Sequence, residues 1–232
     1  WFHTDVGYDK DQQRVLSRIE KMKRFDFMIF GSKQTRQVVD DLYQVSYPKS
    51  TVIYNVIKVD EVLKKAELFE HSFQTDLPVF SSMGRLHHRK GYHTLMQAHK
   101  RLLVDGFPHK IAVIGGGNEM ENLINQRKEL GVEDTFLLLD SQTNPYPYIK
   151  ASDYFILPTQ SESYPLVIGE IMCMRKPIIS TNVGGIVEMI EDGIDGVLIK
   201  YDEDEMYDSM KNFMTNPELV QKIINGTETA YN

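Results

Sequence analysis

Two glutamates, Glu162 and Glu170, stand eight positions apart in the segment SESYPLVIGEIM. A helix start is predicted between them, because Pro165 precedes an apolar run and proline is favoured in the first turn of a helix. Glu162 then lies in the loop before the helix, and Glu170 lies about 7.5 Å along the helix axis. Two carboxylates at that spacing do not share one proton, so we expect them to contact different parts of an extended ligand.

The residues between the two glutamates predict an anion site. In a helix that starts here, the amides of Leu166, Val167 and Ile168 lack partners and carry the positive end of the helix dipole. A diphosphate with hydroxyl-bearing groups at both ends fits this arrangement, since carboxylates accept hydrogen bonds from sugar hydroxyls. The alternative is that Glu162 is a favourable charge near a helix start and Glu170 a surface residue.

A compact cationic loop, GRLHHRKG over residues 84–91, follows another predicted strand. The guanidinium groups of Arg85 and Arg89 match phosphate oxygens, and Lys90 adds a mobile point charge. A solvated basic loop is the alternative interpretation. Three histidines lie in or near this loop: His87, His88 and His93. No cysteine or carboxylate stands beside them at the spacing of a metal site, so we expect no metal site here.

Glycine pairs or triplets follow two more strands. Gly115, Gly116 and Gly117 lead into a helix, which favours anion binding, although the full dinucleotide fingerprint is absent. Gly184 and Gly185 either let the backbone approach a ligand or a neighbouring loop, or make a tight strand-to-helix turn.

These segments must be positioned by an α/β fold. From Pro78 onward, short apolar runs alternate with helical patterns, which predicts a parallel sheet with helices on both faces. Ligands of such sheets bind beyond the carboxyl ends of the strands, where all the segments above lie. Before Pro78, strands are predicted over 25–30 and 51–55, with helices over 32–43 and 59–69. The remaining predicted strands are 79–84, 110–115, 135–140, 154–158, 177–181 and 196–199; the remaining helices are 91–106, 118–130, 145–152, 165–174, 184–193 and one from Pro217.

Composition narrows the class of protein. The 232 residues are 41% hydrophobic and carry a net charge of −7, which is typical of a globular protein and does not favour a nucleic-acid partner. The single cysteine, Cys173, excludes a disulfide framework and is expected to be a buried small hydrophobe in a reducing compartment. No run of apolar residues is long enough to span a bilayer.

Four segments together carry a family resemblance: GRLHHRKG, VIGGGNEMENL, NPYPYIKASDYFILPTQSESYPLVIGE and KPIISTNVGGIVEMIEDGIDGVLI. Residues 78–200 resemble the donor-binding domain of family 4, or group 1, retaining glycosyltransferases of the two-Rossmann GT-B architecture. The resemblance implies a Rossmann-like donor domain over 78–232. Residues 1–77 resemble the last part of an acceptor-side domain whose earlier part is absent from this sequence.

The resemblance also implies roles. Arg85 and Lys90 would neutralise the donor diphosphate and the charge on the leaving group, and Glu162 would lie by the transferred sugar. These three residues are the expected catalytic residues. Glu170 would bind the ribose. The segment around Asp140 would lie near the base. Further donor contacts are implied at Gly84, Gly115, Gly116, Ser141, Ser163, Tyr164, Pro165, Leu166 and Val167. His3 would face the cleft.

Two positions depart from the family pattern. Ser163 replaces the usual glycine after the first glutamate and is expected to narrow the space around the sugar. Arg175 replaces another usual glycine, and we expect it to affect packing.

We therefore expect a retaining, metal-independent glycosyltransferase without a cofactor, using a UDP- or GDP-linked sugar. The acidic segment 201–205 is interpreted as a favourable helix start and not as a metal motif. The expected acceptor is a glycan or a lipid-linked glycan in surface-polysaccharide synthesis. The expected location is the cytoplasm, at the inner face of the membrane through the absent N-terminal part.

Three alternatives remain open: a nucleotide-sugar epimerase of similar build, a phosphorylase-like enzyme, and a fragment that binds the donor without transferring it. The first would need catalytic acids and bases in the N-terminal half, and the second a lysine for pyridoxal phosphate.

Overall fold

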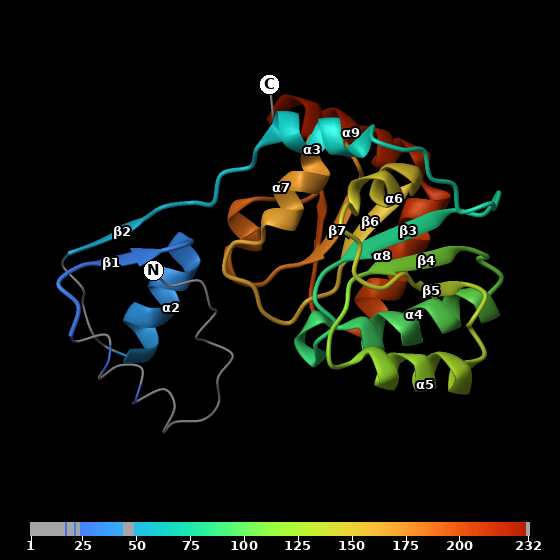
Figure 1. The fold of residues 1–232 in the computed structure, drawn as a ribbon, viewed down its shortest axis with the longest axis horizontal. Helices are drawn as coiled ribbons and strands as arrows, with labels where there is room; N and C mark the ends of the chain where they lie inside the picture. The colour runs from blue at the N-terminus through green and yellow to red at the C-terminus, as the bar shows by residue number, and fades with distance from the viewer. Residues whose placement is uncertain (1–16, 18–20, 22–23, 44–48, 231–232) are drawn as a thin grey trace.

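A six-stranded parallel sheet forms the centre of the molecule (Figure 1). The structure is a computed structural model that describes residues 17, 21, 24–43 and 49–230. The strand order is β5-β4-β3-β6-β7-β8, and every pairing is parallel. The strands are β3 (Val79–Met83), β4 (Lys110–Ile114), β5 (Phe136–Leu138), β6 (Tyr154–Leu157), β7 (Ile178–Thr181) and β8 (Val197–Ile199).

Helices cover both faces of this sheet, as the sequence predicts. Along β4, Ile111 and Val113 face one apolar cluster and Ile114 faces the other, which is the two-residue alternation of a strand. The first cluster includes side chains of α4 (Tyr92–Val104), α5 (Met120–Leu130), α8 (Glu203–Thr215) and α9 (Pro217–Ala230). The second includes side chains of α6 (Tyr146–Ala151), α7 (Leu166–Cys173) and the 3-10 helix η2 (Gly184–Glu188).

A smaller unit precedes this body. Its two strands, β1 (Met28–Phe30) and β2 (Ser50–Val52), pair in parallel. They are joined through α2 (Lys33–Tyr43), which Figure 1 shows beside them. The Oγ of Ser32 accepts a hydrogen bond from the Thr35 amide at 3.0 Å, so Ser32 caps the start of this helix.

Helix α3 (Val59–Ala66) follows the smaller unit in sequence, but it packs on α6 and α7 of the larger body. The side-chain amide of Asn144 donates to the Lys65 carbonyl at 2.7 Å and fixes the end of this helix. A domain boundary at residues 70–77 stays a prediction.

Several predicted elements differ from the structure; the strands predicted over 51–55 and 135–140, for example, end at Val52 and Leu138. The strand predicted over 25–30 begins only at Met28, because β2 provides partners for three residues, and Phe25 is exposed. The helix predicted over 59–69 ends at Ala66. The α-helix predicted over 184–193 is a 3-10 helix that ends at Glu188 and starts from a left-handed Gly184.

Two further sequence interpretations are confirmed. Cys173 is free and buried. Asp202 caps α8, since its Oδ1 accepts hydrogen bonds from the Asp204 and Glu205 amides at 2.9 and 3.2 Å. None of the helices in the described part of the chain is both long and apolar enough to cross a membrane.

Candidate active site

The loops that leave β3, β4 and β5 pack together at the carboxyl edge of the sheet. The Leu86 amide donates to the Gly116 carbonyl at 3.0 Å, and the Gly115 amide donates to the Asp140 carbonyl at 3.0 Å. A methyl group added to Gly115 would lie 1.9 Å from the Gly84 carbonyl oxygen. Glycine is therefore required at Gly115 by loop packing, whether or not a ligand also approaches it.

These three loops line one hollow of about 280 Å³. Five residues expected at the donor site lie around it or at its edge: Gly84, Arg85, Gly115, Gly116 and Ser141. Arg85 is exposed and has no carboxylate partner among the described residues. Asp140, by contrast, contributes its carbonyl to loop packing and its side chain is exposed. A free guanidinium beside a glycine-lined hollow suits an anionic ligand.

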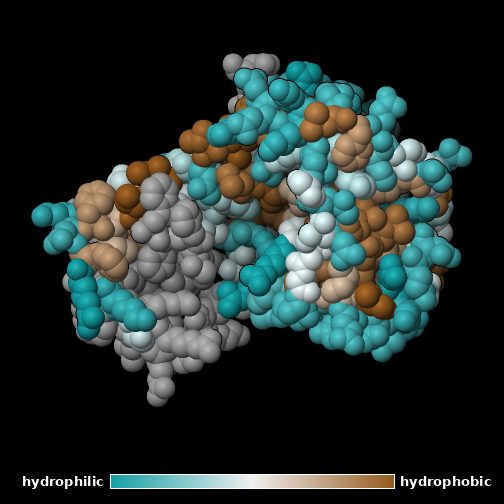
Figure 2. Space-filling view, viewed as in Figure 1, coloured by the Kyte–Doolittle hydropathy of each residue, from teal (hydrophilic) through white to brown (hydrophobic). Residues whose placement is uncertain are grey.

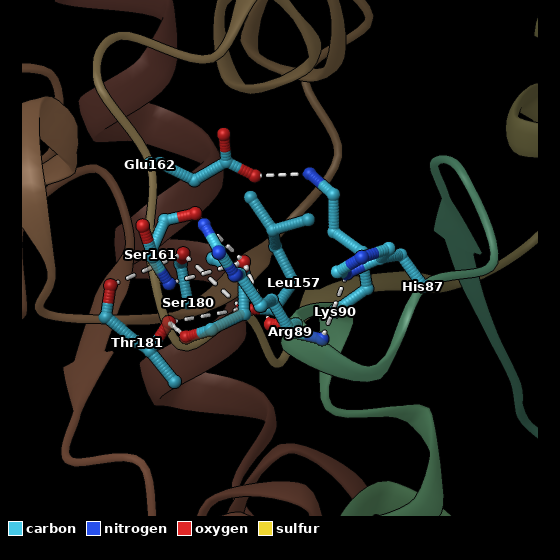
Figure 3. Close-up of polar contacts among 9 residues, drawn as sticks. His87, Arg89, Lys90, Leu157, Ser161, Glu162, Ser180 and Thr181 are labelled. Carbon is cyan, nitrogen blue, oxygen red and sulfur yellow. Dashed lines mark hydrogen bonds and ion pairs between the residues drawn. The ribbon is translucent and has the colours of Figure 1, made fainter. Parts of the chain in front are cut away.

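The cationic loop meets the first glutamate directly. The Nζ of Lys90 forms an ion pair with the carboxylate of Glu162, and Figure 3 shows the two side chains pointing toward one another. Both are largely shielded, with side-chain exposures of 24% and 15%. The backbone holds this pair in place, because the Gln160 amide donates to the Arg89 carbonyl at 2.7 Å.

Helix α7 starts between the two glutamates, as predicted from Pro165. Pro165 itself is the N-cap, with an extended backbone, and Leu166 is the first helical residue. One detail of the prediction is wrong: the Ile168 amide is not free, because it donates to the Pro165 carbonyl at 3.2 Å in a tightened first turn. The amides of Leu166 and Val167 have no acceptor within the described residues, so two donors remain at the positive end of the helix.

Glu170 lies one turn into α7 and is half-buried. Its Oε1 accepts a hydrogen bond from the Tyr146 hydroxyl at 3.1 Å. Burial raises the pKa of the Glu170 carboxyl, while the Tyr146 hydrogen bond and the charge of Lys65 oppose that rise. Glu170, Tyr146 and Leu166 line a second hollow of about 200 Å³ under the segment 56–65. The carboxylate is therefore oriented and reachable.

The loop that carries Glu162 is also packed from the side. A methyl group on Gly184 would lie 1.6 Å from the Glu162 carbonyl oxygen, and one on Gly185 would lie 2.0 Å from the Ser163 carbonyl oxygen. Of the two interpretations of this glycine pair, close backbone approach is confirmed, and its neighbour is the Glu162–Ser163 loop.

Four residues that the sequence did not single out contact this loop or its neighbours: Thr35, Tyr54, Asn55 and Glu188. Their partners lie more than a hundred positions away, so no local pattern could have revealed them. Tyr146 was also missed as a partner of Glu170, although it follows Pro145 in a segment of the expected site. His3 lies outside the described residues.

The described residues contain no group of three or more His, Cys, Asp or Glu side chains placed to hold a metal ion. His93 instead contacts Glu119 at 3.0 Å and Gln126. Independence from metal stays a prediction.

Comparison with known proteins defines the class. The model of the family described as "Glycosyl transferases group 1" matches residues 63–229, well over half of the chain. This chain therefore belongs to the group 1 glycosyltransferases, and its parallel sheet with helices on both faces is the architecture of GT-B members.

Particular relatives and structures are similar to it. N-acetylgalactosamine-N,N'-diacetylbacillosaminyl-diphospho-undecaprenol 4-alpha-N-acetylgalactosaminyltransferase of Campylobacter jejuni is 26% identical over 88% of this chain and 55% of its own length. Alpha-D-kanosaminyltransferase of Streptomyces kanamyceticus is 27% identical over 71% of this chain and 43% of its own length. The structure of Anabaena HepE in complex with UDP matches with a TM-score of 0.82 at 19% identity, covering 98% of this chain and 65% of that one. The chain spans about half the length of the curated relatives that it matches.

Proposed function

We propose that this chain forms the donor-binding side of a retaining glycosyltransferase, which moves a sugar from a nucleotide-diphosphate sugar to an acceptor hydroxyl. The observation that carries the proposal is the arrangement around the start of α7. Glu162 with Lys90 lies before it, two free amides lie at it, and Glu170 with Tyr146 lies one turn after it. An extended ligand with a charged middle and hydroxyl groups at both ends matches that order of groups.

Each group then has a role. Glu170 binds the ribose hydroxyls, and the hollow beside Arg85, Gly115 and Ser141 holds the base and the start of the diphosphate. Arg85, Lys90 and the amides at the α7 start stabilise the charge that develops on the departing diphosphate. When the diphosphate enters, Lys90 exchanges part of its contact with Glu162 for phosphate oxygens, and Glu162 turns to the sugar. The rate enhancement comes from positioning and from this charge stabilisation, without a metal ion.

The ligands and names of related proteins support proposals for the nucleotide, the acceptor and the location. UDP and UDP-glucose are the ligands in the HepE structures, so we propose UDP as the first nucleotide to test. Relatives include the capsular polysaccharide biosynthesis glycosyltransferase CapM of Staphylococcus aureus, and the name of the Campylobacter relative contains a diphospho-undecaprenol. We therefore propose a glycan or lipid-linked glycan acceptor, a role in surface-polysaccharide synthesis, and a place in the cytoplasm at the inner face of the membrane.

The test is calorimetry with UDP, GDP, ADP and their sugars, with and without magnesium. At least one ligand should bind, and magnesium should not be required. Arg85→Ala and Glu170→Ala should each weaken binding by about tenfold or more, because each removes a hydrogen bond to a charged group. Arg101→Ala is the matched control, since Arg101 of α4 is paired with Glu203 and Asp204 of α8 and lines neither hollow. Binding of none of these ligands, or unchanged affinity in both site variants, would overturn the donor site.

The second candidate function is binding of the donor without transfer of its sugar. Transfer of a radiolabelled sugar to polyprenyl-linked or free glycan acceptors separates the two functions: donor binding with no transfer to any acceptor supports the binding function, and transfer supports the enzyme.

A further inference from the structure

Buried hydroxyl groups join the smaller unit to the loop that carries Glu162. The Oγ of Ser163 lies 3.1 Å from the Oγ1 of Thr35, which in turn lies 2.8 Å from the Oγ of Ser32. All three side chains are buried. Thr35 and Ser32 belong to the start of α2, and Ser163 follows β6, so this short chain of hydroxyls crosses between the two units.

The hydroxyl and the carbonyl of Ser163 both have hydrogen-bond partners within the protein. Besides the hydroxyl contact with Thr35, its carbonyl accepts a hydrogen bond from the Gly185 amide at 2.8 Å. A methyl group on Gly185 would also lie 2.8 Å from the Cβ of Ser32, so the three segments meet at one point. The side chain of Ser163 is therefore directed to α2 and not to a ligand in front of α7.

A second contact holds α2 in the same place. The carboxylate of Glu188 accepts hydrogen bonds from the Lys33 amide at 3.1 Å, the Gln34 amide at 2.7 Å and the Tyr54 hydroxyl at 2.8 Å. A carboxylate at a helix N-terminus is favourable because it meets free amides and the positive end of the dipole. Glu188 lies at the end of η2, which begins at Gly184 against the Glu162 carbonyl.

A third contact reaches the residue after Ser163. The side-chain amide of Asn55 donates to the Tyr164 carbonyl at 2.9 Å, and the rings of Tyr54 and Tyr164 lie 4.9 Å apart. The segment 162–164 is thus bound on one side by Lys90 and on the other by the smaller unit. Figure 2 shows a hollow between the two units, with hydrophilic residues along part of the larger body's side of it.

We propose that Ser163 is a positioning residue: through its hydrogen bond to Thr35, the smaller unit sets the place of Glu162, so that the sugar end of the donor site depends on the acceptor side of the protein. The inference rests on the proposed function, because it takes Glu162 to face the sugar. It assigns Ser163 a role different from narrowing the sugar space. Among the described residues, Glu170 and the hollow beside Arg85 share no hydrogen bond with Thr35, so the nucleotide end of the site should not depend on Thr35.

The test compares two ligands in four proteins. Affinities for a nucleotide-diphosphate sugar and for the bare nucleoside diphosphate are measured by calorimetry in the wild type, Ser163→Ala, Thr35→Val and the double variant. Each single variant should weaken binding of the sugar-linked ligand by about fivefold, the size expected for one buried hydrogen bond, and leave the bare diphosphate unchanged. The double variant should be no weaker than either single variant, because both remove the same contact.

Two controls separate positioning from general destabilisation. Thr35→Ser keeps the hydroxyl and should retain wild-type affinity for both ligands. Ser81→Ala removes a different buried hydroxyl, which lies in β3 and is paired with Ser152 at 2.7 Å, and should lower the unfolding temperature without changing either affinity. All affinities are measured on variants whose thermal unfolding is cooperative; should Ser163→Ala not fold, Thr35→Val and Thr35→Ser carry the comparison alone.

The outcomes are distinct. A loss confined to the sugar-linked ligand and shared by the two single variants supports the inference. Unchanged affinity, equal loss for both ligands, or additive losses would overturn it while leaving the donor site intact. A wild-type chain that binds neither ligand would overturn the proposed function, and this inference with it.

Discussion

The two units of this protein are stabilised in different ways. The six-stranded body buries two apolar clusters, one on each face of its sheet, and its four central strands are almost wholly buried. The smaller unit has strands of three residues, and the nearby Phe25 and Phe27 are 64% and 52% exposed. The smaller unit is joined to the larger body by hydrogen bonds to Ser163, Tyr164 and Glu188 of the larger body.

Apolar burial and hydrogen bonding therefore contribute differently to this protein. Apolar burial gives the larger body most of its stability and brings the ends of its strands to one edge. Hydrogen bonds contribute less net free energy each, but they have direction, so they specify where the smaller unit lies. The site is formed where the two kinds of interaction meet, at the loop after β6.

The largest expected loss of stability comes from a substitution in the core of the larger body. Phe80 in β3 is fully buried and packs beside Tyr154, with ring centroids 4.8 Å apart. Phe80→Ala should lower the free energy of unfolding by about 3–5 kcal/mol, because a large cavity remains. Urea unfolding followed by circular dichroism measures the change. Phe30→Ala, an equally buried phenylalanine of the smaller unit, should shift the main transition much less; equal shifts would contradict the contrast between the units.

A pH change acts on the same core. His99 and His109 are fully buried, and the His99 Nδ1 lies 2.8 Å from the His109 Nε2. Burial lowers the pKa of His99 to about 2 and also lowers the pKa of His109. An unfolded histidine has a pKa of about 6.5, so below that pH the unfolded state binds more protons and the folded state loses stability.

Between pH 6.5 and pH 5.5 we expect a loss of about 1 kcal/mol from His99 and a further loss from His109, whose pKa is also lowered, with no loss from either above pH 7.5. Urea unfolding at several pH values measures the slope. The double variant His99→Leu/His109→Leu should show a flatter dependence over that range, whatever its absolute stability. A slope as steep as that of the wild type would contradict the assignment.

A smaller loss of stability is expected when the contact between the two units is removed. Glu188→Ala removes the carboxylate that caps α2 and should cost about 1–2 kcal/mol, concentrated in the smaller unit. Hydrogen exchange of the Lys33 and Gln34 amides should accelerate, while amides of β3 and β4 keep their protection. Glu191→Ala is the control, as a nearby exposed glutamate. Uniform acceleration through the whole chain would show that the contact is not local.

The smallest effect concerns Arg175, which has a left-handed backbone with φ 55°. The conformation gives a physical reason for the glycine that the family usually has there, and the Arg175 side chain pairs with Glu228 of α9 at 2.7 Å. Arg175→Gly and Arg175→Ala both lose this pair, but only glycine relieves the backbone. The glycine variant should therefore be more stable than the alanine variant by about 1 kcal/mol in thermal unfolding. Equal stability would argue against backbone strain at this position.

The sequence by itself determined much of this protein through local rules. Alternating apolar runs and helical patterns predicted the parallel sheet and its two covered faces, and Pro165 predicted a helix start between Glu162 and Glu170. The acidic segment 201–205 was recognisable as a helix start. These features are set by residues within a few positions of each other, so their spacing is enough to reveal them.

Only the tertiary structure decided which distant groups meet. Lys90 pairs with Glu162 across 72 positions, Thr35 meets Ser163 across 128, and Gln34 meets Glu188 across 154. The 3-10 form of η2 likewise follows from close packing of Gly184 against the Glu162 carbonyl. Contacts of this kind depend on how sheets and loops are placed in space, and no periodicity along the chain encodes them. Ser163 illustrates the difference: its position beside Glu162 was visible in the sequence, but its partner on α2 was not.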